Sequence, residues 1–142
     1  MSEPTAARGV VLAHGDLAAG FVDAVRQISG VEEGALEALS NRGLSPEALL
    51  RELERRTADG PTFIFTDLPS GSCCFAARRL SRERPDIIVI TGVNLPLLLD
   101  FVLHRTLPPS QLAARLVEKG RAGIGSVPIE LEGDARRTLS RG

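Results

Sequence analysis

The sequence contains no tryptophan and no tyrosine, and only five of its 142 residues are phenylalanine. So few aromatic rings leave little surface on which bases or sugars could stack. A one-signed charge is also missing, because 17 basic and 18 acidic side chains give a net charge of −1. Proteins that bind nucleic acid present a basic face to the phosphates. We therefore expect no nucleic-acid partner.

Long apolar runs and export signals are absent as well. No run of about 18 apolar residues is available to cross a membrane, and residues 1–5 lack the basic and apolar regions of a signal peptide. The two cysteines, Cys73 and Cys74, are adjacent and make no disulfide framework. These features predict a cytoplasmic protein that reaches the membrane only through its partners.

Common cofactor and catalytic motifs are not found. The glycines near residue 15 do not form Gly-x-Gly-x-x-Gly, no Gly-Lys-Ser/Thr follows the first apolar run, and residues 69–73 are not a Gly-x-Ser-x-Gly elbow. The two histidines, His14 and His104, are far apart and do not have metal-ligand spacing. We expect neither a metal nor a cofactor.

Short apolar runs that alternate with amphipathic segments are the main positive feature. Strands are expected at residues 10–13, 35–40, 62–66 and 86–91, and helices are expected to begin near residues 17, 46, 72, 95 and 110. This alternation predicts an α/β fold with a parallel sheet and helices on both faces. Residues 127–131 alternate with period two around Pro128, which places a last strand at an edge. We expect one domain over residues 1–131 and a polar tail over 132–142.

Polar residues end three of the expected strands. His14, Gly15 and Asp16 follow the first, Asp67 follows the third, and Thr-Gly-Val-Asn at residues 91–94 follows the fourth. The carboxyl ends of parallel strands meet at one edge of a sheet, where ligands bind. The sequence therefore predicts a functional site at this edge.

His14 is the candidate nucleophile. A histidine can accept a phosphoryl group only if one ring nitrogen is unprotonated and exposed, and a carboxylate bonded to the other nitrogen fixes that tautomer. Asp67 is expected to be this carboxylate. Backbone amides at Gly15 and Gly71, each near the start of a helix, and the Ser72 hydroxyl are expected to bind the phosphate. No metal is required for this chemistry.

Each of these residues also has a purely structural interpretation. A histidine after a strand often serves only as a cap or hydrogen-bond partner, and Asp67 can be an ordinary turn residue. Asp16 is more typical of a helix cap than of a catalyst. His104 is expected to be a solvated residue at the end of a helix.

The helix expected after residue 72 carries two further features. Its arginines form a basic face that is usually solvated but could dock an acidic partner: Arg78, Arg79, Arg82 and Arg84. Cys73 and Cys74 lie at its start, where the pKa of a thiol can fall, although burial among small residues is the commoner situation.

Three blocks of the sequence resemble the mannose/fructose-type IIA component of the bacterial phosphoenolpyruvate-dependent sugar phosphotransferase system. Residues 10–18, Val-Val-Leu-Ala-His-Gly-Asp-Leu-Ala, resemble its phosphohistidine segment. Residues 66–72 resemble its Asp-x-x-Gly-Gly-Ser turn, and residues 91–99 resemble its Thr-Gly-x-Asn-Leu-Pro-Met-Leu-Leu segment. The blocks follow the family's order and spacing over most of residues 9–130.

The resemblance implies a phosphocarrier. His14 would accept a phosphoryl group from the phosphorylated histidine-containing carrier protein and pass it to a separate IIB component in sugar uptake, with Asp67 as the orienting carboxylate. The implied fold has strand order 2-1-3-4 and an antiparallel edge strand that is exchanged in a homodimer, a role that residues 127–131 match.

The sequence departs from the family pattern near the site. Ser70 replaces a glycine, Cys73 a proline and Phe75 an asparagine, and Ala13 stands where a small hydroxyl residue is usual. These changes leave open a second hypothesis, a regulatory IIA-like protein whose phosphorylation controls binding to a target without sugar transport. A third hypothesis is a hydrolase that uses Ser72 with His14 and Asp67.

Overall fold

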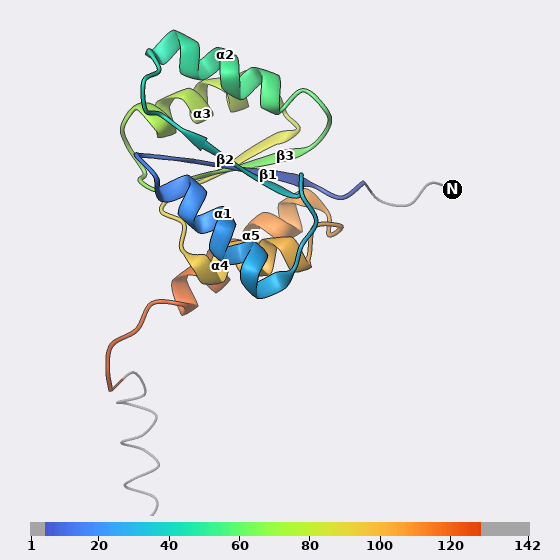
Figure 1. Cartoon of the computed structure of the whole chain (residues 1–142). Coiled ribbons are helices and arrows are strands. Elements are labelled where there is room, and N and C mark those ends of the chain that lie inside the picture. The colour runs from blue at the N-terminus through green and yellow to red at the C-terminus, as the bar shows by residue number, and fades with distance from the viewer. Residues whose placement is uncertain (1–4, 129–142) are drawn as a thin grey trace, which may run out of the picture.

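The computed structural model describes residues 5–128, and over that range the chain forms a parallel sheet flanked by helices. The strands are β1 (Arg8–Ala13), β2 (Leu36–Ser40), β3 (Thr62–Thr66) and β4 (Ile87–Ile90), in the order β2-β1-β3-β4. The helices are α1 (Leu17–Ser29), α2 (Pro46–Arg56), α3 (Ser72–Glu83), α4 (Leu95–Leu103) and α5 (Pro109–Ala122). Figure 1 shows α2 and α3 on one face of the sheet and α1, α4 and α5 on the other. The predicted α/β fold, its layers and its strand order are confirmed.

β1 lies in the middle of the sheet, between β2 and β3, because its residues are apolar toward both faces. Leu12 lies opposite Leu39 of β2 and Thr66 of β3. Alternate side chains of a strand point to opposite faces, so Val11 packs with α1 and α4 while Leu12 packs with α2 and α3. If the alternation continues past the strand, His14 lies on the α2–α3 side of the sheet edge.

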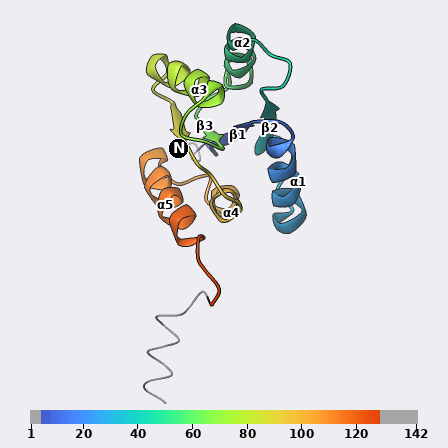
Figure 2. The same cartoon turned by 90° about the vertical axis from the view of Figure 1, so that its left-hand side faces the viewer.

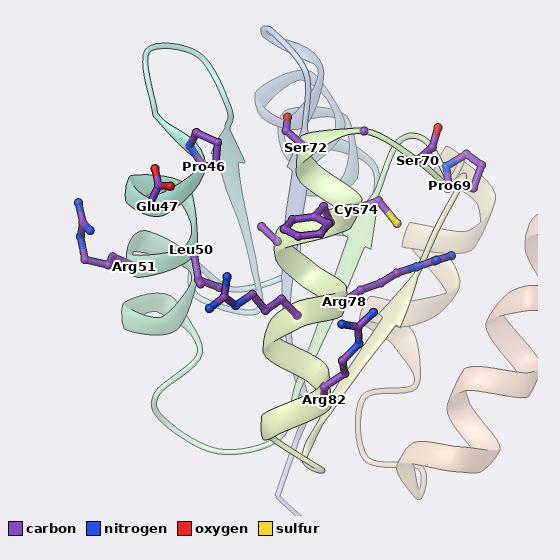
Figure 3. Close-up of a pocket in the computed structure, with 14 residues that line it drawn as sticks. Pro46, Glu47, Leu50, Arg51, Pro69, Ser70, Ser72, Cys74, Arg78 and Arg82 are labelled. Atoms are coloured by element: carbon purple, nitrogen blue, oxygen red, sulfur yellow. The ribbon is translucent and has the colours of Figure 1, made fainter.

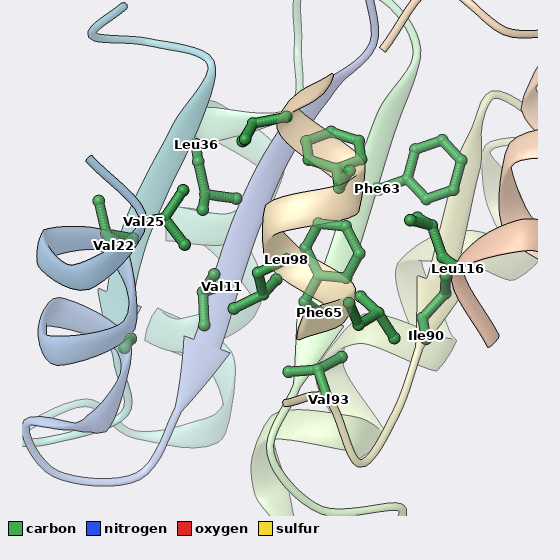
Figure 4. Close-up of a cluster of buried hydrophobic side chains, with 14 of the residues drawn as sticks. Val11, Val22, Val25, Leu36, Phe63, Phe65, Ile90, Val93, Leu98 and Leu116 are labelled. Atoms are coloured by element: carbon green, nitrogen blue, oxygen red, sulfur yellow. The ribbon is translucent and has the colours of Figure 1, made fainter. Parts of the chain in front are cut away.

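The face that α1, α4 and α5 cover has an aromatic core (Figure 4). The ring of Phe101 from α4 lies edge-on to Phe65, at 4.9 Å between centroids, and 5.5 Å from Phe63. A Cβ atom on Gly9 would come within 2.7 Å of the Phe101 ring, so glycine in β1 lets α4 pack this closely. Figure 2 shows α4 between α1 and α5, directly against the sheet.

The opposite face has a smaller core with fewer large side chains. Leu49 and Leu53 of α2 pack there with Leu80, Ala76 and Ala77 of α3. Ser45 starts α2 as the sequence predicts: its side-chain oxygen accepts a hydrogen bond from the N–H of Ala48 at 3.1 Å, and Pro46 follows. The small residues on α3 leave room for the groove described below.

One expectation is corrected in the second half of the chain. Asp100 of α4 is buried and accepts two hydrogen bonds from Arg115 of α5, at 2.8 and 3.1 Å. His104 is not simply solvated: its Nδ1 lies 2.9 Å from the carbonyl oxygen of Asp100 and 3.3 Å from its carboxylate.

Two expectations concern the end of the chain and the membrane. The edge strand expected at 127–131 and the tail at 132–142 lie, beyond Pro128, outside the described residues. None of the helices within residues 5–128 has both the length and the apolar character to cross a membrane.

Candidate functional site

His14 and Asp67 meet at the carboxyl edge of the sheet, because they directly follow the neighbouring strands β1 and β3. His14 Nδ1 lies 2.9 Å from Asp67 Oδ2, and the His14 backbone N–H donates to the same oxygen at 3.1 Å. The other carboxylate oxygen accepts from the backbone N–H of Leu68 at 3.0 Å. The His14 side chain is 41% exposed and that of Asp67 only 11%. The carboxylate is thus fixed, whereas the ring is open to solvent.

The hydrogen bonds determine the charge and the tautomer of this pair. Partial burial raises the pKa of Asp67, but the hydrogen bonds from the backbone and ring of His14, with the charge of the ring, outweigh it and hold that pKa below its usual value. Asp67 is therefore an anion at neutral pH, and it can only accept hydrogen bonds. A neutral His14 then carries its proton on Nδ1, which leaves the lone pair of Nε2 free.

The free side of the His14 ring faces the turn before α3. Gly71 in this turn has φ +92°, and a Cβ atom there would lie 3.8 Å from both Cε1 and Nε2 of His14. No side chain caps α3, so its first backbone N–H groups, from Ser72 onward, have no partner within the helix. Such a helix start binds anions. The structure thus brings Gly71 beside the ring, and Ser72, the first residue of α3, follows it directly.

Residues at the end of β2 and just after it complete the edge, and they were not among the predicted site residues. The Ser40 hydroxyl donates to the Gly15 carbonyl oxygen at 2.8 Å, and the Gly15 N–H donates to Asn41 Oδ1 at 3.4 Å. Arg42 binds Asp16 at 3.0 Å. Asp16 stands at the start of α1 but makes no side-chain cap hydrogen bond, so its expected role as a cap is wrong. The strand order 2-1-3-4 that the resemblance implies places β2 beside β1, and it is the signal that could have included these residues.

The segment after β4 joins α4 to α5 through the side chain of Asn94. Asn94 Oδ1 caps α4 by accepting from the N–H of Leu97 at 3.1 Å, and its Nδ2 donates to the Gly120 carbonyl oxygen of α5 at 2.8 Å. Both polar atoms of this side chain therefore have structural partners.

Cys73 and Cys74 are both buried. Burial, followed by the negative charge of Asp67, raises the pKa of Cys73 to about 11. Burial, which the sequence analysis gave as the commoner situation, is therefore confirmed, and the alternative of a lowered thiol pKa is wrong for Cys73. One arrangement was not expected: a His14 ring nitrogen, an Asp67 carboxylate oxygen and the Cys73 sulfur lie within 4.8 Å of one another. Ser72 is exposed, and among residues 5–128 no hydrogen bond joins its hydroxyl to His14.

A groove of about 770 Å³ lies between α2 and α3 and extends from the Gly71 turn (Figure 3). Phe75, 62% exposed, and Leu50 give it apolar walls. Four arginines also line it: Arg51, Arg78, Arg79 and Arg82. Among the described residues none of these four forms an ion pair. Arg84, by contrast, binds Asp86 through two hydrogen bonds of 2.9 Å, so it does not belong to this basic surface.

Comparisons with known proteins agree on one family. The family model EIIA-man, described as the PTS system fructose IIA component, matches residues 9–114. The sorbose-specific EIIA component of the PTS system from Klebsiella pneumoniae is 34% identical over 95 residues, which are 66% of this chain and 70% of that protein.

Solved structures give the same result. A phosphotransferase system component EIIA from Streptococcus agalactiae has a TM-score of 0.79 and 26% identity, covering 85% of this chain and 97% of that one. A mannose/sorbose-specific IIA subunit from Enterococcus faecalis has a TM-score of 0.76 over 86% of this chain and 95% of that one; its 19% identity is evidence for the fold alone.

Proposed function

Since this chain belongs to the fructose/mannose IIA family of the sugar phosphotransferase system, whose members transfer phosphoryl groups, we propose that His14 Nε2 is its phosphoryl acceptor. The observation that carries the proposal is the hydrogen bond of 2.9 Å between His14 Nδ1 and Asp67. It directs the ring proton away from Nε2 and toward the carboxylate.

The proposed reaction is an in-line transfer between two histidines. Nε2 attacks the phosphorus of a donor phosphohistidine, the donor P–N bond breaks with its electron pair returning to the donor ring, and a new P–N bond forms on His14. Asp67 remains ionised and stabilises the positive charge that develops on the ring. Because donor and product are both phosphoramidates, positioning supplies most of the catalysis.

The phosphoryl oxygens need hydrogen-bond donors. The start of α3 is uncapped and begins directly after Gly71, which lies beside the open side of the ring, and we propose that its N–H groups and the Ser72 hydroxyl bind these oxygens. Gly15 stays a predicted donor. Its N–H is already bonded to Asn41 at 3.4 Å, so it would have to exchange that long bond for a phosphoryl oxygen.

The proposed donor is the phosphorylated histidine-containing carrier protein, and the proposed acceptor is a separate IIB component. Either protein must bring its reacting atom to Nε2, so its surface would cover the Gly71 turn and the adjoining groove. The unpaired arginines favour an acidic rim on the partner. The exposed Phe75 ring is suited to an apolar contact at the centre of such an interface.

The decisive experiment mixes the chain with phosphoenolpyruvate, the general phosphotransferase enzyme and the carrier protein. We expect an acid-labile, alkali-stable phosphoryl group on His14. It should be absent from His14→Ala and present in Ser72→Ala, the matched control for a serine nucleophile. An alkali-labile group on Ser72, or undiminished labelling of His14→Ala, would overturn the proposal.

A further inference from the structure

Three side chains of the kinds that bind transition metals converge at the sheet edge from three different segments. A ring nitrogen of His14, a carboxylate oxygen of Asp67 and the sulfur of Cys73 lie within 4.8 Å of one another. The phosphoryl transfer proposed above uses the first two and has no role for the thiol. We propose that these three residues form a Zn²⁺ site, and that zinc and the phosphoryl group compete for His14.

The donor set is suited to zinc in particular. Histidine nitrogen, cysteine sulfur and carboxylate oxygen are the three ligand types that zinc prefers, and three protein ligands leave one tetrahedral position for water. Mg²⁺ and Ca²⁺ prefer oxygen ligands alone. Ligand atoms around a tetrahedral zinc lie roughly 3–4 Å apart, and His14 Nδ1 and Asp67 Oδ2 are already 2.9 Å apart. The sulfur needs only a small shift to complete the site.

Charge and access also favour a divalent ion. Binding displaces all but one of the waters of the hydrated ion and releases the Cys73 thiol proton to solvent. The carboxylate and thiolate together then neutralise the charge of the ion, so a closely packed site carries no excess charge. Cys73 itself is only 1% exposed. The ion can still enter past the exposed His14 ring, because Gly71 has no side chain to cover it.

The competition follows from the chemistry of imidazole, and this part of the inference rests on the proposed function. If zinc binds Nδ1, the proton of the neutral ring moves to Nε2; if zinc binds Nε2, it uses that lone pair directly. Either way Nε2 loses the lone pair that attacks phosphorus. Zinc would therefore inhibit phosphoryl acceptance reversibly, and a chelator would restore it.

Co²⁺ tests the site without any phosphoryl transfer, since it occupies zinc sites and reports a bound thiolate by a charge-transfer absorption band. The unphosphorylated chain should show this band together with the visible bands of tetrahedral cobalt, and Zn²⁺ should displace both. Cys73→Ser should weaken binding at least about 100-fold, since even loss of a residue behind a metal ligand costs 10- to 100-fold. Cys74→Ser is the matched control, because Cys74 is equally buried but lies outside the cluster, and it should retain the band.

If Cys73→Ser does not fold, Cys73→Ala replaces it in this test. Circular dichroism measures whether each variant is folded. Absence of the thiolate band from the wild-type chain, or its persistence in a folded Cys73 variant, would overturn the inference. Phosphoryl labelling of His14 should fall with added Zn²⁺ in the wild type and in Cys74→Ser, but not in Cys73→Ser. The Cys73→Ser variant thus controls for inhibition by zinc of the general enzyme or the carrier protein in the labelling mixture. A labelled His14 without a cobalt band refutes only the metal site, and a band without labelling refutes only the phosphocarrier.

Discussion

The two faces of the sheet differ in how they are packed and in whether they leave a groove open to solvent. The face under α1, α4 and α5 is filled by large side chains, with Phe101 fully buried between Phe63 and Phe65, and the carboxylate of Asp100, which is buried there, is paired with Arg115. The face under α2 and α3 has a smaller core of aliphatic side chains with Ala and Cys, and it opens into a groove with four unpaired arginines. The first arrangement is typical of a stabilising core, whereas the second is typical of a surface that binds a partner.

The same comparison can be made between two histidine–carboxylate pairs. His104 and Asp100 lie four residues apart on α4, and Arg115 holds the same carboxylate. His14 and Asp67 come from different strands, and the ring of His14 is exposed on its other side. A histidine beside a carboxylate is therefore not sufficient for function. Both rings are partly exposed, 41% for His14 and 33% for His104, so the uncapped helix start beside His14 is what distinguishes the second pair.

The largest effect is expected from phenylalanine on the packed face. Phe101→Ala should lower the free energy of unfolding by about 3–5 kcal/mol, because it removes a buried ring from a close-packed core. Phe75→Ala, on the groove side, should change it by less than about 0.5 kcal/mol, since that ring is mostly exposed. Urea denaturation of both variants measures the difference. Equal losses of unfolding free energy in the two variants would mean that the groove side stabilises the fold as much as the packed face does.

The two carboxylates should separate catalysis from stability. Asp67→Asn should slow phosphorylation of His14 about 100-fold or more, because the amide no longer fixes the tautomer or stabilises the charged ring. Asp100→Asn should instead cost roughly 1–3 kcal/mol of stability, because Arg115 loses its charged partner, with the rate per folded molecule unchanged. Rapid-quench labelling and denaturation of both variants check this. Slower phosphorylation of His14 per folded molecule in Asp100→Asn would show that Asp100 does not act on stability alone.

The groove should contribute less than the acceptor pair itself. Arg78→Glu should raise the KM for the phosphorylated carrier about 10-fold at low salt, which corresponds to about 1.4 kcal/mol, and leave kcat nearly unchanged. Arg26→Glu makes the same charge change on α1, across the sheet from the groove, and should have little effect. Added salt should reduce the difference between the two variants, because exposed charges are screened. An equal rise in KM for both would indicate a general charge effect.

Sequence patterns were sufficient to locate the sheet edge and its central pair. Apolar runs that stop at His14 and Asp67 are local signals, and the parallel order of β1 and β3 brings their ends together. The open nitrogen follows from the same reasoning, because a carboxylate at one ring nitrogen leaves the other free. For these reasons the α/β fold and the meeting of His14 with Asp67 could be predicted without coordinates.

The remaining features depend on pairings between segments distant in sequence. Asn41 contacts Gly15, and Arg42 contacts Asp16; the two partners are 26 residues apart in sequence in each case. These contacts depend on β2 lying beside β1, and the sequence pattern of β2 is weak. Arg115 neutralises Asp100 from another helix. Cys73 has the spacing of no known metal motif, and only the turn between β3 and α3 brings its sulfur toward His14 and Asp67.

The smallest effect expected is the pH dependence of stability that comes from Asp67. Its pKa is lower in the folded chain than in the unfolded one, so its ionised form stabilises the fold fully above the unfolded value, about 3.9. That contribution is lost as the pH falls through the lower, folded value. Asp67→Asn should therefore show a shallower loss of stability below about pH 4 than the wild type, and the two curves should run parallel above pH 5.

Asp59→Asn is the control for this measurement, because its carboxyl is 87% exposed, and it should follow the wild-type curve. Solvent screening of the half-exposed His14 ring keeps the difference small. Denaturation at several pH values measures it. A steeper acid loss in Asp67→Asn than in the wild type would mean that the carboxyl binds its proton more tightly in the fold than in the unfolded chain. Asp67 would then not be a fixed anion. Another group at this edge would have to hold the proton of the His14 ring on Nδ1 and so leave Nε2 free.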